Sequence, residues 1–193
     1  MTTTRVGFVL KSMWRIAVHA SALLVPLVSE IVTKSVVIAV LAVMTVLYVL
    51  SEAVRLRGGQ VPFITWLTMR MRNDDEGAQF IVSPICLAIG VILSLLLFPT
   101  NIAYASISVV AVGDPVAYYV GQRFGRVPIG RKTLEGFAAG LAASLLIASF
   151  WVRPSLSLVG SLSGMLLELA GIFNDNLTVP IGAGSMMLLA SVI

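Results

Sequence analysis

The sequence has 193 residues, of which 58% are hydrophobic and only 11% are charged. A typical soluble domain has about a quarter of its residues charged, so this composition argues against a water-soluble globular protein. The single cysteine, Cys86, excludes an intrachain disulfide framework. We therefore predict one integral membrane domain over residues 1–193.

Seven apolar runs approach the length of about 20 residues that a helix needs to cross a membrane. They cover approximately residues 16–32, 35–52, 80–99, 101–120, 136–152, 156–172 and 177–193. The last run is interrupted by Pro180, Gly182 and Gly184, so six spans with a tilted or half-inserted seventh segment would also fit. We predict an all-α bundle of about seven transmembrane helices, with six as the alternative.

The segment 61–72 differs from these runs because it is too short and too basic to cross a membrane. Its residues Phe63, Trp66, Leu67 and Arg70 fall on one helical face. This pattern is typical of a helix that lies in the membrane interface. We predict a short interfacial helix here.

Basic residues crowd into alternate loops of this seven-span arrangement. Only Lys34 and Arg153 lie on one side. The other side holds Arg5, Lys11, Arg15, Arg55, Arg57, Arg70, Arg72, Arg123, Arg126, Arg131 and Lys132. Because cytoplasmic loops carry an excess of Lys and Arg, the crowded side is predicted to be cytoplasmic. The N-terminus would then be cytoplasmic and the C-terminus would lie on the opposite side.

Several titratable residues fall at or near the cytoplasmic ends of the predicted spans. They are His19, Glu52, Asp114, Glu135, Glu168 and Asp175. Asp175 follows Glu168 by seven residues, or two helical turns, which predicts that both lie on one helical face. A carboxylate within a bilayer costs at least about 2.5–3.5 kcal/mol and needs a partner, a cavity or a metal. Several such residues at one depth predict a single site.

The stretch from Gly113 to Gly136, GDPVAYYVGQRFGRVPIGRKTLEG, is the most informative part of the chain. Asp114 precedes Pro115, where we expect the helix to be broken or kinked. Glycines allow a backbone to approach a ligand closely, and cationic side chains neutralise phosphate oxygens. The stretch contains Gly113, Gly121, Gly125, Gly130, Gly136, Arg123, Arg126, Arg131 and Lys132.

Two interpretations of this basic, glycine-spaced stretch remain open. With Asp114 and Glu135 beside it, it fits a metal–nucleotide complex, in which carboxylates hold magnesium and cations bind phosphates. Thr133 is placed to cap the following helix, whose N-terminus favours an anion. The alternative is an ordinary cytoplasmic loop, where basic residues are expected anyway. Glu135 could also simply complement the helix N-terminus. The flanking acids favour the nucleotide site.

This stretch resembles the signature of the polyprenol kinase family, which includes dolichol kinases, phytol kinases and CTP-dependent diacylglycerol kinases. That family has a Gly-Asp pair, a glycine-spaced basic stretch and a Lys-Thr/Ser-x-x-Gly element. The matching residues are Gly113, Asp114, Ala117, Gly121, Gly125, Lys132, Thr133 and Gly136. A second match is ELAGIFNDNLTVP, with Glu168, Asp175, Asn176 and Pro180. Weaker matches are Arg15 with His19, and Ser51-Glu52 with Arg55.

The resemblance implies transfer of the γ-phosphate of CTP to a lipid alcohol: a polyprenol or dolichol, phytol or geranylgeraniol, or diacylglycerol. On this resemblance, Asp114 and Asp175 hold Mg²⁺, supported by Asn176 and Glu168. The triphosphate would be cradled by Arg123, Arg126, Arg131, Lys132 and Thr133. The nucleotide-binding set also takes in Gly113, Gly121, Gly125, Gly136 and Glu135.

The residue that orients or deprotonates the lipid hydroxyl is left open between Glu52, Glu168 and Asp114. Glu52 could instead simply pair with Arg55, one turn away. His19 is a further catalytic candidate, with the alternative that it is a packed interfacial residue. The expected partners are CTP, a lipid alcohol and membrane lipids, without nucleic acid. The oligomeric state is left open, a homodimer included.

Two other functions compete with the kinase. A phosphatidate cytidylyltransferase shares the Gly-Asp and Lys-Thr-x-Glu-Gly elements and would make a CDP-activated lipid. Its C-terminal basic signature is missing, because no basic residue follows Arg153. A small transporter could also use intramembrane carboxylates, but its charges would be expected near the midplane rather than at the cytoplasmic ends.

Overall fold

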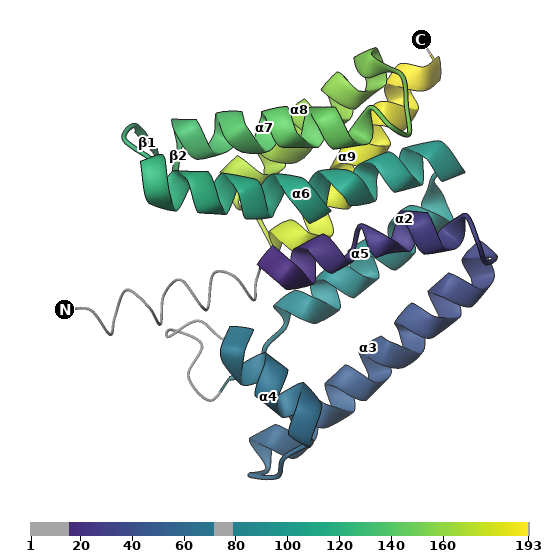
Figure 1. Ribbon diagram of the computed structural model, residues 1–193, viewed down its shortest axis with the longest axis vertical. Coiled ribbons are helices and arrows are strands. Elements are labelled where there is room, and N and C mark those ends of the chain that lie inside the picture. The colour runs from purple at the N-terminus through teal and green to yellow at the C-terminus, as the bar shows by residue number, and fades with distance from the viewer. Residues whose placement is uncertain (1–15, 72–78, 193) are drawn as a thin grey trace.

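The computed structural model describes residues 16–71 and 79–192, and this part of the chain is helical apart from one two-stranded hairpin (Figure 1). Residues 16–21 form a short helical segment. The elements that follow are α2 (Leu24–Ser29), α3 (Lys34–Leu56), α4 (Pro62–Met71), α5 (Ser83–Leu97), α6 (Thr100–Phe124), β1 (Pro128–Ile129), β2 (Lys132–Thr133), α7 (Leu134–Ala148), α8 (Pro154–Ala170) and α9 (Asp175–Val192). The predicted all-α class is confirmed.

Each of the seven apolar runs contains helix, although the helices differ from the predicted spans in length. The first run is divided by a turn at Ala22 and Leu23, between the segment 16–21 and α2. Helices α5 and α7 have 15 residues each and α8 has 17. Two helices, α3 and α6, are long and apolar enough to cross a membrane. A helix also lies at Pro62–Met71, where a short helix was predicted.

Two prolines lie inside helices that continue past them. Helix α6 runs through Pro115 and α9 runs through Pro180, so neither helix is broken at its proline, and the alternative of a kink at Pro115 stays a prediction. A proline removes one backbone hydrogen bond and usually bends a helix. Here both prolines are buried. Packing against neighbouring helices stabilises α6 and α9 and offsets the backbone hydrogen bond that each proline removes.

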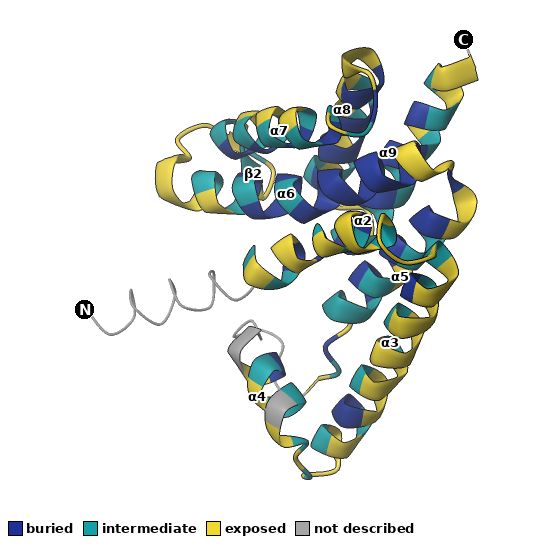
Figure 2. Ribbon diagram, turned by 45° about the vertical axis from the view of Figure 1, so that its right-hand side comes forward, coloured by how far each residue is buried: buried dark blue, intermediate teal, exposed yellow. Residues whose placement is uncertain are grey.

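Helix α6 is the centre of the core. It packs against α5, α7, α8 and α9, and Figure 2 shows it as the most continuously buried helix. Of its most apolar 18-residue window, 78% is buried. Small side chains such as Ala103, Ala105 and Ala111 are completely buried on it and let several helices approach together.

Helix α3 has the opposite character. It is more apolar than α6, yet only 17% of its most apolar window is buried. Figures 1 and 2 show it standing apart from α6 to α9, with α4 beside its C-terminal end. Its exposed residues include Val36, Val40, Val43, Met44, Leu47 and Leu50. A large apolar surface of this kind is unusual for a protein that is surrounded by water.

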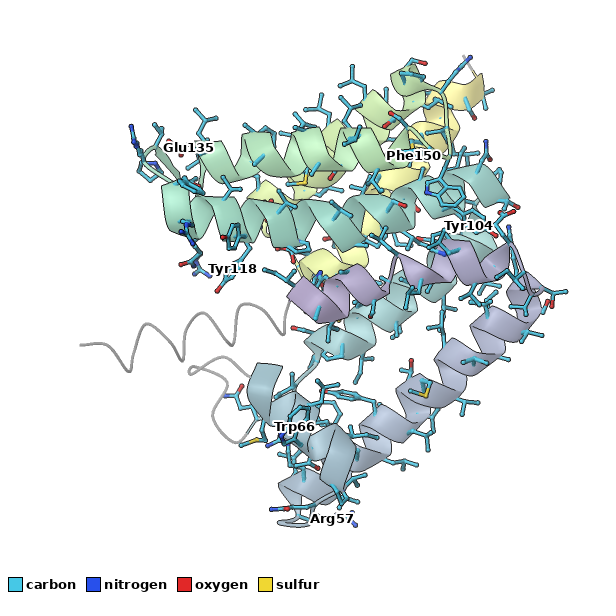
Figure 3. All side chains as sticks on the ribbon, viewed as in Figure 1. Arg57, Trp66, Tyr104, Tyr118, Glu135 and Phe150 are labelled. Carbon is cyan, nitrogen blue, oxygen red and sulfur yellow. The ribbon has the colours of Figure 1, made fainter. Side chains whose placement is uncertain are left out.

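The connections separate into two ends of the bundle. The β1–β2 hairpin and the α8–α9 turn lie at one end, and the α2–α3 and α7–α8 turns lie at the other (Figure 1). Figure 3 labels Glu135 and Phe150 at opposite ends of α7. The hairpin end carries Lys132, Glu168 and Asp175, whereas Lys34 and Arg153 lie at the far end.

Candidate active site

Three carboxylates from three helices converge at the hairpin end of the bundle. Asp114 comes from α6, Glu168 from the end of α8 and Asp175 from the start of α9. One oxygen atom of each lies within 4.8 Å of the others. Asp114 and Glu168 are buried, and Asp175 is half-buried. We call these three residues the acid cluster. The prediction that the acids at the ends of the predicted spans gather in one place agrees with the positions of these three.

The α8–α9 turn explains how Glu168 and Asp175 meet. Helix α8 ends at Gly171, whose φ of 55° is the left-handed conformation that glycine adopts easily. Helix α9 then starts at Asp175, and the Asn174 side chain accepts a hydrogen bond from the backbone N–H of Asn176. The predicted shared helical face is therefore wrong, because the chain reverses between the two acids.

A lysine from the hairpin contacts two of the three acids. The strands pair antiparallel, with Ile129 opposite Lys132, and Gly130 turns the chain with a φ of 61°. The ammonium nitrogen of Lys132 lies 2.6 Å from Glu168 Oε1 and 3.0 Å from Asp175 Oδ2. It also donates a hydrogen bond to the backbone carbonyl of Glu168. Lys132 thus neutralises part of the charge of the acid cluster.

The donor set of the acid cluster fits a divalent cation that prefers oxygen ligands. Glu168 is 3% exposed, and its Oε2 atom has no hydrogen-bond partner among the described residues. A buried carboxylate oxygen without a partner is costly, and a metal ion is one way to satisfy it. Carboxylates are also the protein ligands that Mg²⁺ usually takes. Asp114, Glu168 and Asp175 are therefore the residues that could hold such an ion.

A cavity of about 420 Å³ opens beside the acid cluster. Its described lining contains all three acids and both hairpin cations, together with apolar and aromatic residues. The residues are Asp114, Ala117, Tyr118, Gly121, Gln122, Arg131, Lys132, Thr133, Gly136, Phe137, Glu168 and Asp175. Figure 3 shows Tyr118 and Glu135 towards this end of α6 and α7. The cavity brings phosphate-binding and metal-binding residue types together.

Three polar or aromatic lining residues were missed by the sequence analysis: Tyr118, Gln122 and Phe137. Tyr118 and Gln122 follow Asp114 at intervals of four residues, so they share its helical face. That spacing was a usable signal once α6 was known to continue past Pro115. Phe137 carries no comparable signal, because one aromatic residue on an apolar helix is ordinary.

The glycines of this region serve helix packing. A Cβ atom on Gly121 would lie 2.8 Å from Thr133 Oγ1, and one on Gly136 would lie 2.6 Å from the Ala117 carbonyl oxygen. Gly113 is likewise pressed against Ser144 and Met165, and Gly125 against Thr133. These contacts let α6 and α7 approach closely. Close helix packing explains these four glycines, and because Gly121 and Gly136 also line the cavity, their role in admitting a ligand stays a prediction.

Thr133 caps α7, as predicted. Its side-chain oxygen accepts a hydrogen bond from the backbone N–H of Gly136 at 3.2 Å. Glu135 lies in the first helical turn, and both of its carboxylate oxygens accept from the backbone N–H of Val127, at 3.2 and 3.3 Å. Glu135 therefore ties the hairpin loop to α7, and the described lining of the cavity does not include it.

The four predicted phosphate-binding cations divide into two pairs. Arg131 and Lys132 line the cavity. Arg123 and Arg126 are exposed, and neither belongs to its described lining. Arg123 donates to the Tyr119 hydroxyl at 3.3 Å, and its guanidinium lies 5.8 Å from the Phe124 ring centroid. The first pair is therefore better placed for a ligand in this cavity.

His19 reaches the acid cluster from the N-terminal part of the chain. Its Nδ1 atom lies 3.3 Å from Asp114 Oδ2, and both side chains are almost completely buried. The two residues are 95 positions apart, so their pairing results from tertiary structure. His19 is thus a neighbour of the acid cluster, as expected for either a catalytic or a packed residue.

Glu52 and Asn176 lie in a different environment. The carboxylate of Glu52 accepts two hydrogen bonds from Arg55, at 2.7 and 2.8 Å, and one from the backbone N–H of Ile81 at 3.1 Å. The amide of Asn176 donates to the carbonyl of Ser83 at 3.0 Å. Both residues therefore anchor the start of α5, and neither is part of the cavity's described lining.

Comparison of the chain with models of known protein families, with curated proteins and with solved structures found no match. The resemblance to polyprenol kinases therefore rests on the residues of this chain alone.

Proposed function

We propose that the chain is an integral membrane lipid kinase, similar to polyprenol kinases, that transfers the γ-phosphate of CTP to a polyprenol- or dolichol-type alcohol. The observation that carries this proposal is the meeting of three carboxylates with Arg131 and Lys132 in one cavity. Phosphoryl transfer depends mainly on positioning and on charge neutralisation, and these residue types supply both.

The membrane setting is part of the proposal. Helix α3 is apolar and largely exposed, which suits contact with lipid chains. Seven membrane-crossing segments, with six as the alternative, would place the acid cluster and the hairpin at the cytoplasmic face. Helix α4 would lie in the interface. This orientation follows from the crowding of basic residues in alternate loops of the predicted spans.

The residues of the cavity then have separate roles. Arg131 and Lys132 would bind phosphate oxygens, while Asp114, Glu168 and Asp175 would hold Mg²⁺. The bound ion would neutralise charge on the β- and γ-phosphates. The alcohol oxygen forms a bond to the γ-phosphorus as the bond to the β–γ bridging oxygen breaks, and CDP leaves. The hydroxyl proton goes to a carboxylate oxygen, for which Asp114 or Glu168 is better placed than Glu52.

The test is a transfer assay with the purified full chain in nanodiscs. The protein is incubated with Mg²⁺, γ-³²P-labelled CTP and one lipid alcohol at a time, and label in the organic phase is counted. We expect label on an isoprenoid alcohol. A parallel reaction uses α-³²P-labelled CTP and phosphatidic acid. Label in the lipid of this second reaction would indicate a cytidylyltransferase instead, and no lipid label in either reaction would reject both.

A further inference from the structure

Lys132 and any divalent cation at the acid cluster must compete for the same carboxylates. The ammonium nitrogen already contacts Glu168 Oε1 and Asp175 Oδ2 at 2.6 and 3.0 Å. These two acids and Asp114 are also the only group of three potential metal ligands found among the described residues. Two cations this close together repel each other strongly where solvent is largely excluded.

We propose that Lys132 is a built-in competitor that makes divalent-cation binding at the acid cluster conditional on the nucleotide triphosphate. This inference rests on the proposed function, because it assigns the regulation of the same site. With Lys132 on the acids, a cation alone binds weakly. A triphosphate offers Lys132 another set of anionic oxygens, and the cation then takes the carboxylates.

The position of Lys132 suits such an exchange. Its side chain is 29% exposed, whereas Glu168 is 4% exposed in the same pair, so the lysine is the partner with room to move. It extends from a hairpin of only two residues per strand, on a flexible four-carbon stem. Arg131 lines the same cavity and would attract the phosphates that Lys132 joins.

The acid cluster also retains a ligand atom that Lys132 leaves unsatisfied. Glu168 Oε2 is buried and has no hydrogen-bond partner among the residues described. The lysine therefore satisfies only part of the buried carboxylate, and a cation that reaches this oxygen gains an interaction that Lys132 does not make. This difference favours the cation once Lys132 has another anion to bind.

Coupling of this kind is reciprocal. If the nucleotide raises the affinity for the cation, the cation raises the affinity for the nucleotide by the same factor. The site would then take up the two together and would bind neither tightly alone. Removing the Lys132 charge should tighten binding of the cation alone and weaken binding of the nucleotide. Opposite effects from one substitution are not expected of a residue that only stabilises the fold.

The experiment measures Mn²⁺ binding by the purified full chain without nucleotide, with free Mn²⁺ followed by electron paramagnetic resonance. Wild type, Lys132→Met and Arg131→Met are compared. Arg131→Met is the matched control, because it removes the same charge from the same hairpin without touching an acid-cluster contact. We expect Lys132→Met to bind Mn²⁺ at least about tenfold more tightly than wild type. Arg131→Met should change the affinity by less than about threefold.

The outcomes separate this inference from the proposed function. Equal Mn²⁺ affinities for wild type and Lys132→Met would overturn the competition and leave the metal site intact. Absence of Mn²⁺ binding in every variant would overturn the metal site and the competition together.

A second measurement uses the wild type alone, in case Lys132→Met does not fold. The acetylation rate of Lys132 is followed by mass spectrometry with and without millimolar Mn²⁺. Because the cation alone binds weakly, the Mn²⁺ concentration is raised until electron paramagnetic resonance shows that the site is filled. We expect the acetylation rate to rise as the site fills, because the ion displaces the ammonium from the acids, and an unchanged rate at full occupancy would contradict the proposal.

Discussion

Asp114 and Asp175 line the cavity from α6 and α9, two helices that are far apart in the sequence. Because each carboxylate has its own position in the cavity, we expect that neither can replace the other. The variants Asp114→Asn and Asp175→Asn keep the size of the side chain and remove its charge. We expect each to lower lipid phosphorylation by at least about a hundredfold, because charge neutralisation supplies much of phosphoryl transfer. The measurement is the ³²P-transfer assay on protein that elutes normally in gel filtration.

The control is Glu30→Gln, which removes an exposed carboxylate that lies just before α3, at the far end of the bundle. It should keep turnover close to that of wild type. Near-normal activity of either aspartate variant would show that the assignment of metal ligands is wrong.

We expect Glu52 to stabilise the fold through the hydrogen bonds that its carboxylate accepts from Arg55 and from the backbone N–H of Ile81. Glu52→Gln leaves the Arg55 charge without its carboxylate partner, which should lower the free energy of unfolding. We expect a clearly lower melting temperature in detergent and unchanged Mn²⁺ binding.

The double variant Glu52→Gln/Arg55→Met removes the uncompensated charge and should recover part of the lost stability. If Glu52→Gln melts like wild type but loses turnover, Glu52 has a direct catalytic role and the structural explanation is wrong.

The α6–α7 pair shows how small residues set the geometry of the site. A Cβ on Gly140 would lie 2.8 Å from both the Ala117 Cβ and the Gly113 carbonyl oxygen. Gly140→Val should therefore force the two helices apart and cost about 1–3 kcal/mol in stability. Thermal unfolding in detergent measures this cost. Ala138→Val, on the exposed side of the same helix, should melt within a few degrees of wild type.

Most helices were predictable because each of the seven apolar runs contains helix, and α4 was predictable from its separate short segment, whereas the β1–β2 hairpin was not predicted. The Thr133 cap was predictable from local chemistry alone, since a threonine before a helix has few other roles. The reversal between α8 and α9 agrees with the separate runs 156–172 and 177–193, but the seven-residue spacing of Glu168 and Asp175 also suggested one helical face across that break, which was wrong. Gly171, which lies between these two acids, was the sequence signal for the turn.

The role of the site glycines was not predictable from the sequence for a different reason. A glycine that admits a ligand and a glycine that admits a neighbouring helix look identical until the neighbour is known. Similarly, nothing in the sequence places Lys132 on Glu168 and Asp175, because the contact depends on how the hairpin folds over the α8–α9 turn. The resemblance to polyprenol kinases indicated which residues form the candidate site, whereas the residues that each of them contacts depend on tertiary packing.

The whole molecule has two chemically different ends, and this gives a test of orientation. In a Cys86→Ala background, Val127→Cys marks the hairpin end and Arg153→Cys marks the far end. A membrane-impermeant maleimide added to intact cells should label Arg153→Cys at once and Val127→Cys only after lysis. Labelling of both positions from the outside would contradict the proposed arrangement of spans.

The pairing of His19 with Asp114, and of Lys132 with Glu168 and Asp175, also sets an order in time. The ribosome makes the buried acids of α6 and α8 before it makes α9. If these helices cross a membrane, as proposed, a growing chain holds Asp114 and Glu168 in a hydrocarbon environment without Asp175 during that interval. Insertion of α9 would then complete the site, and slow or failed insertion of this one helix should give a chain that is membrane-bound but transfers no phosphate.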